Sequence, residues 1–130
     1  MLIFGHRFIP SRSFYHVLDI DSISNTPPSS TICVQFSEEN LDIINHASLN
    51  NISISISVNS ILELIYSASL GASFIIVERN LALDAQKIAT EYLYDSKILV
   101  HINDENEIEE LALHGMDGVI LPSAIIKINS

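Results

Sequence analysis

The sequence has 130 residues, of which 48% are hydrophobic and 17% are charged. This length and composition are those of one compact domain with a buried core, and they exclude a disordered or low-complexity chain. Six Lys and Arg residues against sixteen Asp and Glu residues give a net charge of −10, which repels phosphate backbones and anionic membranes, so we expect no nucleic-acid or membrane partner.

The first 30 residues contain two candidate strands and require no helix. The candidate strands are residues 1–8 and 14–18, and a connector at 25–30 contains Pro27 and Pro28. Proline lacks an amide hydrogen and keeps the preceding residue extended, so this connector should be exposed and stiff. We expect residues 1–30 to form an extended segment that packs at one edge of the sheet.

Residues 31–126 alternate short runs rich in β-branched residues with longer stretches of helical periodicity. This alternation is typical of repeated βα units, whose strands form a parallel sheet. The predicted strands begin at intervals of roughly 20 to 24 residues, which leaves room for one helix and two short loops. They are residues 31–36, 52–58, 74–78, 98–102 and 118–121.

The helix ends carry their own signals. Ser37, Ser60 and Asp104 are each followed by acidic residues within one turn, which is typical of helix starts. Gly71 and Gly115 follow two predicted helices, where the chain needs a positive φ to enter the next strand.

The run 52–58 alternates isoleucine or valine with serine. One face of this strand is therefore apolar, and the other face carries hydroxyl groups. A strand buried on both faces rarely has this pattern. The pattern favours a position near a sheet edge or tight packing against small side chains, and serines that line a polar cavity are the alternative.

Together these elements predict one α/β domain over residues 1–130, with a mainly parallel sheet of five or six strands flanked by helices. A flavodoxin-like open sheet is the preferred form. The alternative is a half βα-barrel that completes itself as a homodimer, because four or five βα units cannot close an eight-stranded barrel alone.

The single cysteine, Cys33, lies between Ile32 and Val34. It cannot form an intramolecular disulfide, and a thiol in such a run usually behaves as a small buried hydrophobic group. No apolar run approaches the roughly 18 residues that span a bilayer, and no signal peptide is recognisable. We expect a cytoplasmic protein.

Candidate site residues follow the predicted strands. Parallel α/β proteins bind ligands beyond the carboxyl ends of their strands. His6 and Arg7 follow the first candidate strand, and Glu78 and His101 lie at or near the ends of two later ones. Imidazole, guanidinium and carboxylate groups that meet there can transfer protons or bind a metal ion, so these four are the candidate catalytic residues. The alternatives are solvated loop residues and, for His101, a structural hydrogen-bonded role.

The sequence indicates no cofactor. It has no glycine-rich phosphate loop, no Cys-x-x-Cys and no His-Glu-x-x-His, which are the motifs that bind nucleotides and metals most recognisably. The cofactor, any metal and the identity of the partner therefore stay unknown.

Two segments resemble a known family. Residues 98–111 and 115–120 are similar to the last βαβ unit of glycerophosphodiester phosphodiesterases, which are βα-barrel enzymes. Gly5-His6-Arg7 resembles the His-Arg pair after the first strand of that family. The resemblance implies that His6 acts as an acid/base residue and that Arg7 binds phosphate. The opening 5–10, Gly-His-Arg-Phe-Ile-Pro, is also similar to that of a small bacterial family, which implies no particular activity.

Two functions are compatible with these observations. The lack of a complete catalytic motif favours a non-catalytic binding or protein-interaction module, with a protein or a small molecule as its partner. The alternative is a phosphodiester hydrolase or other phosphate-handling enzyme, in which Glu78 and His101 assist His6 and Arg7.

Overall fold

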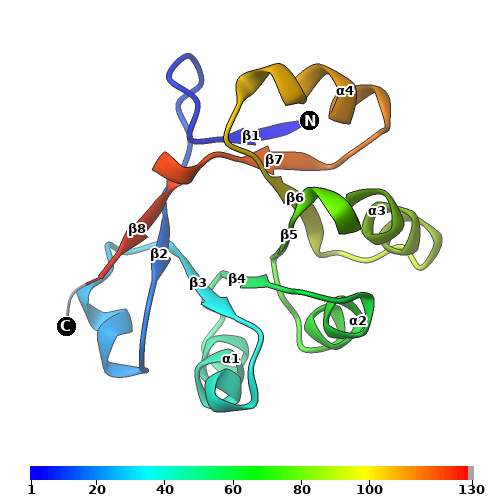
Figure 1. Ribbon diagram of the computed structural model, residues 1–130. Helices are drawn as coiled ribbons and strands as arrows, with labels where there is room; N and C mark the ends of the chain where they lie inside the picture. Colours follow the sequence, from blue (N-terminus) through cyan, green and yellow to red (C-terminus); the bar gives the residue numbers. More distant parts are fainter. Residues whose placement is uncertain (129–130) are drawn as a thin grey trace.

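The computed structural model describes residues 1–128, in which one sheet of eight parallel strands is accompanied by four α-helices (Figure 1). The sheet is open and curled into a half-barrel, with β1 and β8 at its two edges, and its strand order is β1-β7-β6-β5-β4-β3-β2-β8. The strands are β1 (Leu2–Phe4), β2 (Phe14–His16), β3 (Thr31–Gln35), β4 (Ile54–Ser57), β5 (Phe74–Val77), β6 (Lys97–His101), β7 (Gly118–Ile120) and β8 (Ile125–Lys127).

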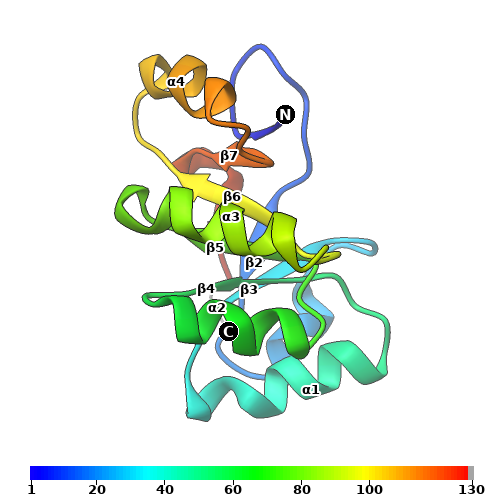
Figure 2. The ribbon, with the colours of Figure 1, turned by 90° about the vertical axis from the view of Figure 1, so that its right-hand side faces the viewer.

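The helices cover the convex face of the sheet, and α2 and α3 pack against each other there (Figures 1 and 2). They are α1 (Leu41–Leu49), α2 (Ile61–Ser69), α3 (Ala82–Glu91) and α4 (Ile108–Leu113). Short 3₁₀ turns precede α1, α3 and α4, namely η2 (Glu38–Asn40), η3 (Arg79–Leu81) and η4 (Glu105–Glu107); η1 (Asp21–Asn25) follows β2, and η5 (Pro122–Ala124) joins β7 to β8. No helix within residues 1–128 is long and apolar enough to cross a membrane.

The three predicted helix starts are confirmed. The side chain of Ser60 accepts a hydrogen bond from the backbone N–H of Glu63 at the start of α2. Ser37 and Asp104 accept in the same way at η2 and η4, one short turn before α1 and α4. These oxygens satisfy N–H groups that have no partner within the first turn. Gly71 and Gly115 adopt the expected positive φ, 88° and 75°.

The curled sheet has a separate apolar core on each face. Isoleucine and valine side chains on the convex face pack against the helices. On the concave face, the rings of Phe4, Phe14 and Phe74 lie with their centroids 5.0 to 5.5 Å apart. Cys33 is buried among them, as predicted for a thiol within an apolar run. Eight short strands therefore bury apolar side chains on both faces although helices cover only one.

The serine strand lies in the middle of the sheet, so the favoured edge position is wrong. β4 pairs with β3 on one side and with β5 on the other. Its isoleucines contribute to the core beneath the helices, and Ser55 is fully buried on the other face, where it donates a hydrogen bond to the carbonyl of Ile32 at 3.3 Å. Phenylalanine rings already fill much of the concave face, so only small side chains fit on this strand.

Three other expectations need correction. The sheet has eight strands, not five or six, because both candidate strands of the first 30 residues join it as β1 and β2 and the three-residue β8 adds a further strand. Residues 1–30 do not pack at one edge: β1 pairs with β7, whereas β2 lies between β3 and β8. A flavodoxin-like sheet carries helices on both faces, but here they lie on one, so the half-barrel alternative describes the shape.

Candidate functional site

The carboxyl ends of the parallel strands meet at one rim of the curled sheet, and the four predicted site residues lie along it. His6 and Arg7 follow β1, Glu78 follows β5, and His101 is the last residue of β6. The structure pairs Glu78 with His101 and brings His6 and Arg7 to Glu105. The two groups line separate cavities that share no residue. The catalytic role of all four residues stays a prediction.

His6 connects the loop after β1 to the turn η4. Its Nε2 lies 2.5 Å from Oε2 of Glu105, and its Nδ1 accepts a hydrogen bond from the backbone N–H of Phe8 at 3.1 Å. A carboxylate can only accept, so Nε2 carries the proton of the neutral ring. With both nitrogens engaged and 9% of the side chain exposed, His6 is placed to hold the loop in position.

Arg7 and Glu105 form the outer part of this contact. Nη1 of Arg7 lies 3.3 Å from the same carboxylate oxygen, and its guanidinium lies over the ring of Phe8, 4.4 Å from the centroid. The hydrogen bond from His6, followed by the charge of Arg7, lowers the pKa of Glu105 below its ordinary value. Glu105 is therefore ionised at neutral pH. An adjacent cavity of about 410 Å³ is lined by His6, Arg7, Glu105 and also Asp104.

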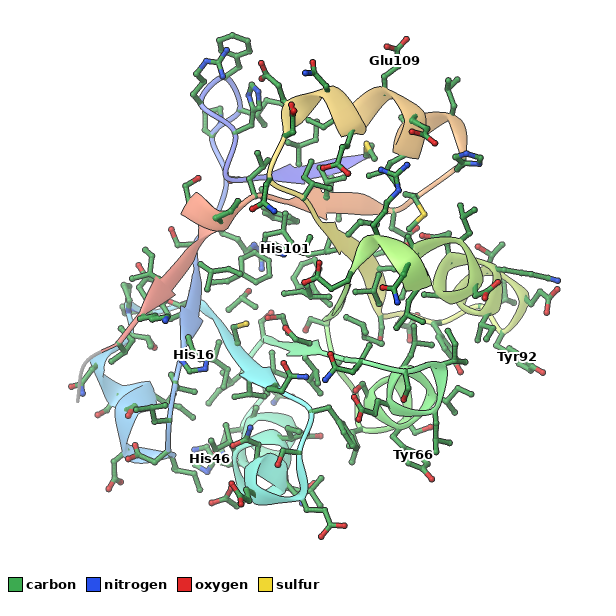
Figure 3. The ribbon with its side chains drawn as sticks, viewed as in Figure 1. His16, His46, Tyr66, Tyr92, His101 and Glu109 are labelled. Atoms are coloured by element: carbon green, nitrogen blue, oxygen red, sulfur yellow. The ribbon has the colours of Figure 1, made fainter. Side chains whose placement is uncertain are left out.

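His101 and Glu78 form the second pair, and His101 lies on the inner side of the curled sheet (Figure 3). Its Nδ1 is 3.2 Å from Oε1 of Glu78. The His101 side chain is 26% exposed and the Glu78 side chain 65%. Because β5 and β6 are neighbours in the sheet, the residue directly after β5 and the last residue of β6 lie close together.

This pair belongs to a larger polar group, which we call the mouth cavity. The cavity has a volume of about 190 Å³ and opens at the carboxyl ends of β3 to β6. Its polar lining residues come from four adjacent strands or from the residues directly after them, and its apolar lining comes from three further side chains. The polar residues are Gln35, Ser57, Asn59, Glu78 and His101, and the apolar residues are Val58, Ile76 and Ile125.

Sequence reasoning did not single out Gln35 or Glu105, and it placed the serines of the run 52–58, which include Ser57, in a polar cavity only as an alternative. Gln35 and Ser57 end their strands on the concave face, and the alternation within the runs 31–36 and 52–58 is a signal that places them there. Glu105 is different, because its partner His6 is 99 positions away. No local pattern in the sequence predicts the contact between Glu105 and His6.

Within residues 1–128, no group of three or more His, Cys, Asp or Glu side chains is close enough together to hold a metal ion. The largest acid and imidazole groupings on the rim are the pairs already described. The residues that line the mouth cavity include one carboxylate and one imidazole.

Comparison of the chain with models of known protein families and with curated proteins finds no match. The resemblance of residues 98–120 and of Gly5-His6-Arg7 to glycerophosphodiester phosphodiesterases therefore stays a prediction.

Proposed function

We propose that this protein is a non-catalytic binding module that holds a small polar molecule in the mouth cavity. The observation that carries the proposal is the convergence of five polar side chains from neighbouring strand ends on one cavity with apolar walls. A cavity with mostly apolar walls and a few directed polar groups is the usual form of a ligand site. The carboxyl ends of parallel strands are also the usual place for one.

The size of the cavity restricts the ligand. Sites for drug-sized ligands have volumes of roughly 300 to 1,000 Å³, whereas the mouth cavity has about 190 Å³. Two of its lining residues, Ile76 and Ile125, also belong to the packed concave core. The expected ligand is therefore a compound well below drug size that enters from the rim.

The alternative function, phosphodiester hydrolysis, receives less support from the geometry around His6. Both ring nitrogens of His6 are already hydrogen-bonded, so neither is available to take a proton from a substrate. Arg7 is paired with Glu105, and the carboxylates of Asp104 and Glu105 line the same cavity. These carboxylates repel a phosphodiester.

Ligand binding can be tested by native mass spectrometry of gently purified protein, together with a thermal-shift screen of small polar metabolites. We expect one compound to be retained or to raise the melting temperature. The Asn59→Ala and His101→Phe variants should lose this effect, since each removes a polar group from the cavity. The matched control is His114→Phe, because His114 is exposed after α4 and does not line the mouth cavity.

Two results would count against the proposal. One is a screen in which no compound stabilises the wild-type protein, and the other is stabilisation that survives both cavity substitutions. Hydrolysis of a generic phosphodiester in the presence of divalent ions, lost in His6→Ala, would favour the alternative function instead.

A further inference from the structure

The hydrogen bond between His101 and Glu78 determines which nitrogen of the His101 ring carries the proton. The carboxylate of Glu78 can only accept, so Nδ1 of His101 is the donor across the 3.2 Å separation. In the neutral ring, Nε2 then has a free lone pair and acts as an acceptor. Among residues 1–128, Nε2 has no hydrogen-bond partner, and the ring lines the mouth cavity.

The charges around the cavity restrict the ligand further. Glu78 is its only acidic lining residue, and no lysine or arginine of the described residues lines it. An anionic ligand would meet an uncompensated carboxylate in a protein of net charge −10. A cationic ligand would compete with His101 for that single carboxylate. An uncharged ligand avoids both costs.

The remaining lining groups match hydroxyl chemistry. Gln35 and Asn59 each offer an amide that donates and accepts, and Ser57 offers a hydroxyl. A hydroxyl group of a ligand also donates and accepts, so a molecule with several hydroxyls can satisfy this mixed set. Ile76 and Ile125 offer apolar surface to its C–H groups.

We propose that the ligand of the mouth cavity is an uncharged polyhydroxylated small molecule, a proposal that rests on the proposed binding function. One of its hydroxyl groups donates a hydrogen bond to Nε2 of His101. Glu78 is a positioning residue, which fixes the proton on Nδ1 and so presents Nε2 to the ligand as an acceptor. Because Nε2 accepts, His101 selects ligands that present a hydrogen-bond donor at this position.

The first part of the test measures the imidazole tautomers by long-range ¹H–¹⁵N NMR, at a pH at which the rings are neutral. We expect the Nδ1–H form for His101 and the Nε2–H form for His6, which serves as an internal reference. The Glu78→Ala variant should lose the preference at His101 and leave His6 unchanged. The Glu109→Ala variant is the matched control, because Glu109 is exposed on α4 away from the cavity (Figure 3).

The second part titrates labelled protein with erythritol, xylitol and myo-inositol, and with xylonate and 2-amino-1,3-propanediol as anionic and cationic counterparts. The polyols should shift the side-chain amide signals of Gln35 and Asn59. His101→Phe should weaken binding about tenfold, as expected for one lost hydrogen bond. His101→Gln should bind more tightly than His101→Phe, because its amide oxygen can still accept. An unchanged backbone amide spectrum confirms that each variant is folded.

The outcomes separate this inference from the proposed function. Tighter binding of xylonate or of the amine at the same signals, or an Nε2–H form of His101, overturns the polyol inference and leaves a binding cavity in place. If none of the five compounds shifts a signal from the cavity, the polyol inference is overturned. If the metabolite screen also finds no ligand, the proposed function fails with it.

Discussion

Glu105 holds the amino-terminal loop through a contact that depends on its charge. It receives hydrogen bonds from His6 and Arg7, and the one from His6 contributes most to lowering its pKa. A carboxyl whose pKa is lower in the folded state stabilises the fold above its unfolded pKa, which is about 4.3 for glutamate. This stabilisation is lost as the pH falls through the lower folded value.

We therefore expect wild type to melt at a higher temperature than Glu105→Gln at pH 7. The difference should shrink as the pH falls below about 4.3, where the wild-type carboxyl becomes protonated. Thermal unfolding of both proteins between pH 3 and pH 7 measures this difference in melting temperature. Glu109→Gln is the control and should show little difference from wild type at any pH. A difference for Glu105→Gln that does not vary with pH would contradict the argument.

At the level of secondary-structure elements, the concave core connects strands that are not neighbours in the sheet. Phe14 of β2 is fully buried and lies edge-on to Phe4 of β1, although these strands are not neighbours in the sheet order. The carbonyl of Phe4 accepts a hydrogen bond from the N–H of Leu121, and that of Gly5 accepts one from the hydroxyl of Ser123. The two edges of the sheet are therefore linked through β1, η5 and the phenylalanine cluster.

Phe14→Ala should lower the free energy of unfolding by about 3 to 5 kcal/mol, because it leaves a cavity between strands that are distant in the sheet. Urea unfolding measures the change. Phe8→Ala is the matched control. Phe8 is 72% exposed, and its loss should cost less than about 1 kcal/mol. Similar costs for both variants would show that the concave face is not a packed core.

The curled shape of the whole molecule encloses its single thiol. Cys33 is 5% exposed on the concave face, and burial raises the pKa of its thiol above the ordinary value. The thiolate is the reactive form. Native protein should therefore react with Ellman's reagent at pH 8 far more slowly than protein unfolded in urea. The reaction rate should follow the unfolded fraction through the urea transition. Fast labelling of the native protein would mean that the sheet opens between its edges.

Local patterns predicted the elements that have strong signals. The five strands predicted within residues 31–126 are each found within one or two residues of their expected bounds, because β-branched runs favour extended backbone. Helix starts at Ser37, Ser60 and Asp104 are equally local, since a cap bonds within its own turn. β8 is missed because three residues after a proline turn show no periodicity.

The candidate site was predictable only in part. The rule that ligands bind at strand ends led to His6, Arg7, Glu78 and His101, all of which lie on the rim. Their partners were not predictable to the same degree. Glu78 meets His101 because β5 and β6 are adjacent, whereas His6 meets Glu105 only because the sheet order places β1 next to β7 and two strands from β6.

The sequence by itself determined the alternation of strands and helices, the helix caps and the positions of polar residues at strand ends. These depend on interactions within a few residues, which the local order of side chains specifies. Only the tertiary structure decided the number of strands, the curl of the sheet and the grouping of Gln35, Ser57, Asn59, Glu78 and His101 around one cavity. The physical reason is that strand order and curvature come from packing between residues far apart in the chain, on both faces of the sheet at once.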